Sequence, residues 1–310
     1  MNVFVHAILP IFIALALGFV AGRILSHRSQ QFLSKAQTLL IYILLLCIGF
    51  ELSHNFPHFS AISTYIGWGV LYGIVTSLGS FFVVYLIYRT RAKKTTHATE
   101  TTTPPTATLL DACLPCAIPI LFFLVGVACA KSMQVLDLNT DLIPSSEHIL
   151  WYLLFLIGSD LSRQLNLLKF PSKPFLWVPL FSILGAYLAA ILLSFISDLT
   201  VLQAVLVSSG MGWYSLSGSL ISSQYQASLG TIALCSDLTR EILSIILIYV
   251  WGQKQTLSCI ACAGATAMDV TLPIIKKNTD HSSLVLALYS GIVISFVVPL
   301  LLMATLSLLL

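Results

Sequence analysis

Residues 208–223, SSGMGWYSLSGSLISS, place three glycines and seven serines in an otherwise apolar part of the chain. A second stretch of this kind, CAGATAMDVTLPII at 262–275, contains Asp269 and Pro273. Glycine weakens a helix and proline removes a backbone hydrogen-bond donor, so neither stretch favours an unbroken helix. Within a bilayer, such backbone is tolerated only inside protein or beside water. We therefore expect both stretches to be broken or re-entrant.

The composition around these stretches is typical of an integral membrane protein. Of the 310 residues, 57% are hydrophobic and only 9% are charged, and the mean hydropathy is +0.95. Soluble domains carry about 25% charged residues, so this chain lacks the side chains needed to cover a water-facing surface. The net charge of +3 is too small for a nucleic-acid partner. The lipid bilayer is the expected environment.

We predict an all-α integral membrane protein, because the apolar runs are continuous rather than alternating. A helical span needs about 20 residues. Ten hydrophobic segments meet or approach this length: 3–25, 36–54, 62–88, 112–133, 148–163, 174–197, 201–223, 228–251, 256–275 and 283–309.

The chain contains an internal repeat. The string LLLCIGFELS (44–53) matches LLFLIGSDLS (153–162) at six of ten positions, at an offset of 109 residues. Gly18 matches Gly126 at almost the same offset. Each unit has three segments, an odd number, so the second copy enters the membrane inverted. Inverted repeats are typical of secondary-transporter scaffolds.

This repeat divides the chain into four parts. Residues 1–88 form the first three-helix repeat, 89–111 a cytoplasmic linker, and 112–197 the second, inverted repeat. Residues 198–310 form a core with the two broken segments and the substrate site. Glu51 and Asp160 occupy matching positions of the two repeats, either as gate carboxylates or as interface residues.

Lysine and arginine predict the orientation. They gather in the loops after the first, third and fifth segments, whereas 52–61 has none. Cytoplasmic loops carry the excess of positive residues, so we expect both the N-terminus and the C-terminus outside.

Four charged residues lie where lipid is expected: Asp237, Arg240 and Glu241 in 228–251, and Asp269 in 256–275. Each costs about 2.5–3.5 kcal/mol at the bilayer centre. Arg240 and Asp237 can neutralise each other as a structural pair. Glu241 and Asp269 then leave a net negative site, suited to a cation or to protons.

Two other chemistries are set aside. Cys113/Cys116 and Cys259/Cys262 have the spacing of a metal or redox site, but both pairs begin apolar segments without a nearby histidine. We expect no metal and no other cofactor. An intramembrane hydrolase, with serines near the buried aspartates, remains a remote alternative because no span interior supplies a histidine base.

Three strings carry a resemblance to a known family: SGMGWYSLSGSL, SDLTREIL and GATAMDVTLP. The chain resembles LysO-type bacterial lysine exporters, most specifically across 208–275. The resemblance implies a transporter, not an enzyme, that moves L-lysine and its toxic analogue thialysine out across the bacterial cytoplasmic (inner) membrane. It also implies eight full spans, an outside N-terminus, and a transport role for Glu241 and Asp269. The chain departs from the family at Tyr249, where members often have proline.

We place the substrate at the two broken segments. Glu241 and Asp269 would receive an ammonium group or a proton, with Asp237 and Arg240 beside them. Half-helix N-termini offer N–H groups and a positive dipole end for the α-carboxylate. The glycines that permit close approach, the hydroxyls and the stacking aromatic rings are Gly212, Gly264, Ser215, Ser217, Thr266, Thr271, Trp213 and Tyr214.

Exporting Lys⁺ against an inside-negative potential costs about 2.3 kcal/mol per 100 mV. A proton that enters in exchange cancels this charge, so we expect proton antiport. The alternatives are a proton- or sodium-coupled carrier of another small metabolite, such as arginine, and a channel.

Overall fold

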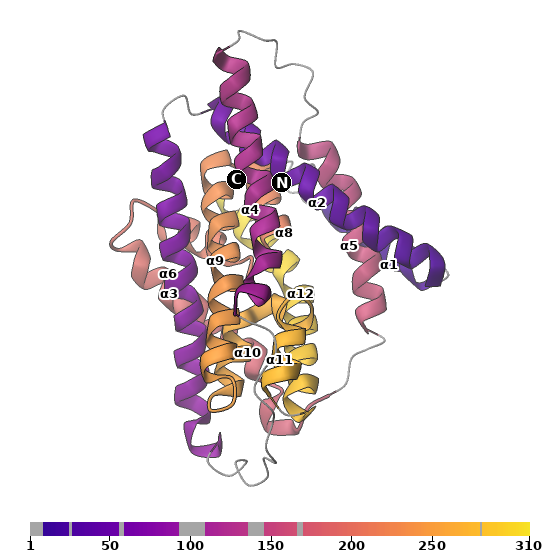
Figure 1. Ribbon diagram of the computed structural model, residues 1–310, viewed down its shortest axis with the longest axis vertical. Helices are drawn as coiled ribbons and strands as arrows, with labels where there is room; N and C mark the ends of the chain where they lie inside the picture. The colour runs from indigo at the N-terminus through magenta and orange to yellow at the C-terminus, as the bar shows by residue number, and fades with distance from the viewer. Residues whose placement is uncertain are drawn as a thin grey trace.

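The computed structural model describes residues 9–24, 27–55, 59–92, 109–135, 146–165, 170–279 and 281–310. These residues form helices and short connections, with no strand among them (Figure 1). The longer helices are α1 (Leu9–Ile24), α2 (His27–Asn55), α3 (Phe59–Ala92), α4 (Leu109–Val135), α5 (Ser146–Leu165), α6 (Val178–Ser194), α9 (Ala227–Trp251) and α12 (His281–Leu309). The shorter ones are η2 (Lys173–Phe175), α7 (Val201–Ser208), α8 (Tyr214–Gln224), α10 (Thr256–Ala263), η3 (Gly264–Met268) and α11 (Leu272–Asn278).

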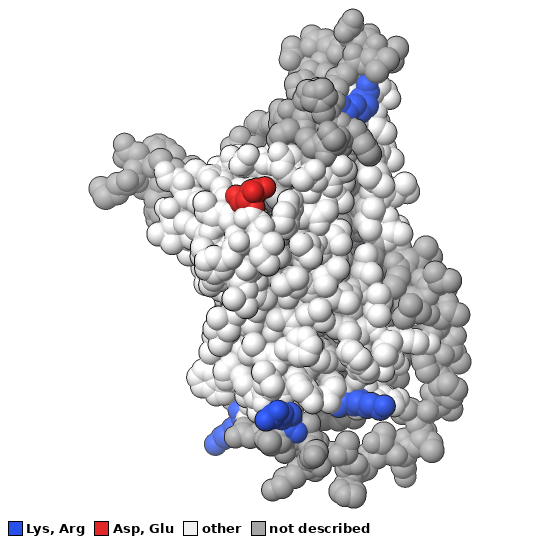
Figure 2. All heavy atoms as spheres, turned by 90° about the vertical axis from the view of Figure 1, so that its left-hand side faces the viewer, with Lys and Arg blue, Asp and Glu red and all other residues white. Residues whose placement is uncertain are grey.

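The described helices have the apolar character of a membrane protein. Four stretches are long and apolar enough to cross a bilayer: Lys35–Ser53, Ile62–Arg89, Lys173–Ser194 and Ser283–Leu309. α9 has the length of a span, but its centre carries three charged residues. On the face in Figure 2, basic side chains lie near the two ends of the long axis, and most of the surface between them is uncharged. The all-α prediction is confirmed.

The predicted linker at 89–111 is helical at both of its ends. α3 continues to Ala92 and α4 begins at Leu109, while 93–108 lie outside the described residues. The start of the first predicted segment, residues 3–8, also lies outside them. α3 therefore extends beyond the predicted segment that ends at residue 88.

Glycine contacts fix the close packing of two helix pairs, α1 with α5 and α2 with α4. A Cβ added at Gly18 would overlap the carbonyl oxygen of Phe155, and one at Gly126 would overlap that of Leu46. Gly158 meets the Leu15 carbonyl in the same way. Such small residues allow helix backbones to approach closely in membranes.

α9 runs through the core of the molecule and packs against α3, α8 and α10 (Figure 1). Asp237, Arg240 and Glu241 are each 1–2% exposed. The charged face of α9 is therefore turned into the protein rather than toward lipid.

Both glycine-rich stretches are interrupted. α7 ends at Ser208 and α8 begins at Tyr214, with Met211 at φ 51° and Gly212 at φ 98° between them. α10 ends at Ala263, where Gly264 has φ 63°. Glycine adopts such left-handed backbone without the steric cost that other residues incur. These two interruptions are called the first break (209–213) and the second break (264–271) below.

The two breaks meet in the fold. The backbone N–H of Ala265 donates to the carbonyl oxygen of Met211 at 2.9 Å. A Cβ added at Gly264 would overlap the same Met211 carbonyl. Their crossing therefore depends on glycine at 264.

Candidate functional site

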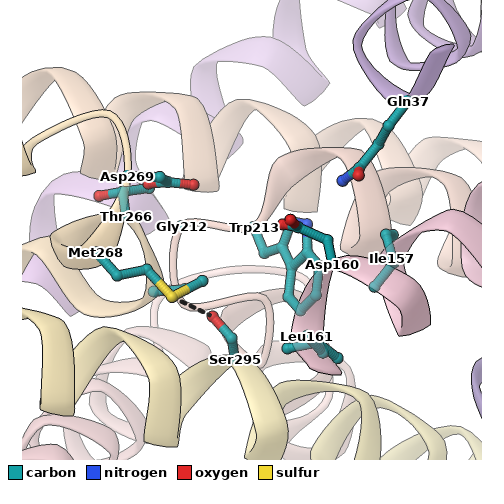
Figure 3. Close-up of a pocket in the computed structure, with 11 residues that line it drawn as sticks. Gln37, Ile157, Asp160, Leu161, Gly212, Trp213, Thr266, Met268, Asp269 and Ser295 are labelled. Carbon is teal, nitrogen blue, oxygen red and sulfur yellow. Dashed lines mark hydrogen bonds between the residues drawn. The ribbon is translucent and has the colours of Figure 1, made fainter. Parts of the chain in front are cut away.

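A pocket lies beside the crossing of the two breaks. It contains about 410 Å³ of empty space, part of which is open to the outside. Five parts of the chain contribute to it: α2, α5, the two breaks and α12. The lining residues are Gln37, Ile157, Asp160, Leu161, Gly212, Trp213, Ala265, Thr266, Met268, Asp269 and Ser295 (Figure 3).

Two carboxylates line this pocket. Asp269 follows η3 and is exposed, and Asp160 near the end of α5 is half-buried. They enter the pocket from different sides (Figure 3). Asp269 Oδ1 accepts a hydrogen bond from the backbone N–H of Val270 at 2.6 Å, which orients the carboxylate. Two negative groups at one pocket suit a ligand that carries positive charge.

The second break is held by its own threonines. The Thr271 hydroxyl donates to the Thr266 carbonyl at 2.9 Å, and the Thr266 hydroxyl donates to the Ala263 carbonyl at 2.9 Å. The Thr266 carbonyl also accepts from the backbone N–H groups of Asp269 and Thr271, each at 3.2 Å, so the break is closed by local hydrogen bonds. They also place Thr266 and Asp269 on the pocket wall.

Asp237 belongs to α9 and is not among the lining residues of the pocket. Its side chain contacts the start of α8. Its Oδ1 accepts from the backbone N–H of Gly212 at 2.7 Å, and its Oδ2 accepts from the Ser217 hydroxyl. A Cβ added at Gly210 would overlap Oδ2. A carboxylate at this place complements the positive end of the helix dipole.

Arg240 belongs to α9, and its side chain reaches the C-terminal end of α10. Its Nη1 donates to the Cys262 carbonyl at 3.1 Å and to the Ser80 hydroxyl of α3 at 3.4 Å. Ser80 donates to the Ser182 carbonyl, and Ser182 donates to the Ala261 carbonyl at 2.6 Å. Arg240 thus takes part in a polar network that joins α3, α6, α9 and α10.

The remaining predicted site residues lie in two groups. Gly212, Trp213 and Thr266 line the pocket. The others are not among its lining residues: Gly264, Tyr214, Ser215, Ser217 and Thr271.

Glu241 and Glu51 lie outside the pocket lining. Glu241 is buried on α9, one position beyond Arg240, and Glu51 is half-buried on α2. The pocket therefore brings Asp269 together with Asp160, whereas the sequence analysis paired Asp269 with Glu241.

Sequence reasoning missed Gln37, Met268 and Ser295. Ser295 lies in the apolar helix α12, and its hydroxyl donates to the Met268 sulfur at 3.8 Å (Figure 3). The sequence offered one signal for Gln37 and Ser295: each is a single polar residue at the edge or in the middle of an apolar span. Such residues are common in helix packing, so this signal does not indicate a site by itself.

The part of the chain that the structure describes contains no cluster of three or more His, Cys, Asp or Glu side chains suited to a metal. Cys259 and Cys262 are buried free thiols. The described residues of the pocket thus offer carboxylates, hydroxyls and an indole ring.

The long apolar helices and the charges buried between them are those of a multi-pass membrane protein. A family model described as the lysine exporter LysO matches residues 12–103 and 120–306. The chain belongs to this family.

Two curated relatives agree with this membership. The lysine exporter LysO of Escherichia coli K12 is 25% identical over 287 residues, which covers 91% of this chain and 94% of the relative. A Haemophilus influenzae protein named "Putative lysine exporter" is 34% identical over 160 residues, covering 51% of this chain and 82% of that protein. No solved structure matches.

Proposed function

We propose that the protein exports L-lysine across the bacterial inner membrane by secondary active transport, and that thialysine shares this route. Family membership supports the substrate. The observation that carries the proposal is the pair of carboxylates, Asp160 and Asp269, that line one pocket at the crossing of the breaks.

The chemistry of the pocket fits a diamino acid. Asp269 and Asp160 receive the two ammonium groups, and Trp213 packs against the aliphatic stem or the cation. α8 begins directly after Trp213, but the Asp237 carboxylate already occupies the positive end of its dipole, so this helix end is not free to bind the α-carboxylate. Glu241, which is buried on α9 next to Arg240 in the sequence, serves in proton transfer and does not contact lysine directly.

Proton antiport follows from the same carboxylates. A bound cation favours the ionised form of a carboxylate, whereas the like charge of the second carboxylate in the pocket favours the protonated form. Lysine and protons therefore compete for the site. Exchange of one Lys⁺ for one proton removes the cost of about 2.3 kcal/mol per 100 mV for moving a charge outward.

We further propose an inverted-repeat scaffold of eight full spans and two broken segments, with both termini outside. The reciprocal glycine contacts support it: Gly18 against Phe155 and Gly126 against Leu46 are equivalent positions under the repeat. Each repeat thus uses the same glycine to contact the other.

The pocket faces the cytoplasm in this arrangement. Tyr88, next to Arg89 near the end of α3, donates to the Pro174 carbonyl at 2.7 Å, so two positive loops share one end of the molecule. Gln37 lies two positions beyond Lys35, and α5 ends at Leu165, just before the same cytoplasmic loop. Access from this side suits an exporter. Glu51, the repeat equivalent of Asp160, serves as the gate carboxylate of the outward-facing state.

Counterflow of labelled lysine in proteoliposomes tests the function. Internal unlabelled lysine should drive uptake of external labelled lysine, and an imposed pH gradient should drive net lysine movement. If unlabelled arginine competes with labelled lysine as well as unlabelled lysine does, the substrate would be cationic amino acids in general rather than lysine. Lysine flux that follows sodium and ignores pH would contradict the antiport.

A further inference from the structure

α9 presents opposite charges to opposite ends of two half-helices. The Asp237 carboxylate accepts from the Gly212 N–H and the Ser217 hydroxyl at the beginning of α8. Arg240, three positions later, donates from Nη1 to the Cys262 carbonyl in the last turn of α10 at 3.1 Å. Both side chains are 1% exposed. Each charge therefore lies at the helix end whose dipole it complements.

The guanidinium occupies the place where the two breaks cross. A Cβ added at Gly264 would lie 3.6 Å from Nη1 of Arg240, and one added at Gly212 would lie 3.5 Å from Cδ. Both glycines belong to the breaks. In transporters with discontinuous helices, the unwound carbonyls and half-helix C-terminal ends are the groups that coordinate Na⁺.

We propose that Arg240 is a positioning residue that supplies, from within the protein, the positive charge that a coupling Na⁺ brings to such a crossing. It holds the carbonyl end of α10 against α9, and Asp237 holds the start of α8 on the same helix. The crossing that positions Asp269 is thus complete without a metal ion, so transport needs no sodium. This inference rests on the proposed lysine transport.

The second guanidinium nitrogen of Arg240, Nη2, argues against a role in packing alone. Nη2 is buried and has no hydrogen-bond partner among the described residues. A buried donor without an acceptor is costly, and a residue that only fills space needs no such group. An arginine retained at this cost indicates that its charge is required.

The experiment compares Arg240→Ala and Arg240→Lys with the wild type in two measurements. The first is the melting temperature of purified protein in detergent, without lysine. The second is the initial rate of lysine counterflow in proteoliposomes, in sodium buffer and in sodium-free potassium buffer. Methylguanidinium at millimolar concentration is added to each, with urea as the uncharged control.

We expect equal wild-type rates in both buffers. Arg240→Ala should lower the melting temperature and reduce the rate at least tenfold, and methylguanidinium, but not urea, should restore part of both. Arg240→Lys should retain more of each than Arg240→Ala. Asp269→Asn is the matched control, because its loss of transport should not respond to methylguanidinium.

Three outcomes would overturn the proposal: a sodium requirement in the wild type, wild-type rates for Arg240→Ala, or no rescue of its melting temperature by either methylguanidinium or the lysine variant. If Arg240→Ala cannot be purified, the wild-type rates in the two buffers and the Arg240→Lys variant still test the proposal. A wild type that moves no lysine contradicts the proposed function, whereas the melting-temperature rescue tests Arg240 independently of any substrate.

Discussion

Asp269 is the most informative single residue to change, because it lies within the second break and lines the pocket. Asp269→Asn keeps the size of the side chain and removes its charge. A hydrogen bond to a charged group contributes about 1.5–3 kcal/mol, so we expect lysine counterflow to weaken at least about tenfold. The measurement is the initial rate at matched membrane levels.

Asp198→Asn is the control for this change. Asp198 is an exposed carboxylate in the turn between α6 and α7, outside the pocket lining. Its variant should transport as the wild type does. Normal transport by Asp269→Asn would place the substrate elsewhere, with Glu241 as the next carboxylate to test.

Asp237 should affect stability more than substrate affinity. Asp237→Asn removes the charge from a buried carboxylate that accepts from the Gly212 N–H and the Ser217 hydroxyl, and each hydrogen bond to a charged group contributes about 1.5–3 kcal/mol. We expect a clearly lower melting temperature and poor expression. Ser217→Ala removes only one of these two hydrogen bonds, so it should cost less, about 1.5–3 kcal/mol. Equal melting temperatures for Asp237→Asn and the wild type would show that the carboxylate is dispensable for the fold.

The sequence located these charged residues because charge is rare and costly in a span. It did not pair Asp160 with Asp269. Asp160 lies near the end of its segment, where a carboxylate is common, and the two are brought together only by the packing of α5 beside the breaks. Distances between helices that are far apart in the sequence were not contained in any local pattern.

At the scale of elements, glycine and proline composition predicted both interruptions, since the backbone requirement is local. Gly264→Ala tests this point. The residue has φ 63°, and an added Cβ would overlap the Met211 carbonyl. Left-handed backbone at a residue other than glycine costs about 1–3 kcal/mol. We expect a lower melting temperature and slower counterflow.

Gly67→Ala is the matched control within the same protein. Gly67 lies in α3, and an added Cβ there would meet nothing within 4 Å. Alanine favours a helix over glycine by about 1 kcal/mol, so this variant should be as stable as the wild type or more so. If Gly264→Ala behaves in the same way, the second break does not depend on glycine.

At the scale of the whole molecule, the repeat makes a symmetric prediction. Gly18→Leu and Gly126→Leu each force a side chain into a carbonyl of the opposite repeat. Because the two contacts are equivalent under the repeat, we expect similar losses of melting temperature. A large loss at one position and none at the other would contradict an inverted repeat.

Orientation is tested separately, by reporter fusions. Alkaline phosphatase fused after Leu310 should be active and green fluorescent protein at the same position dark, because the C-terminus is predicted to lie outside. Fusions after Ala92 should give the opposite result. A fluorescent C-terminal fusion would contradict the orientation inferred from lysine and arginine.

The hydrogen bond from Ala265 to Met211 has a consequence for biogenesis. The ribosome releases the first break well before the second, because α8, α9 and α10 separate them in the chain. The Met211 carbonyl therefore cannot accept its hydrogen bond from Ala265 until synthesis has passed α10. The pocket is therefore among the last parts of the core to form. A nascent chain that stalls before residue 265 has inserted helices but lacks the residues of the second break that complete the substrate pocket.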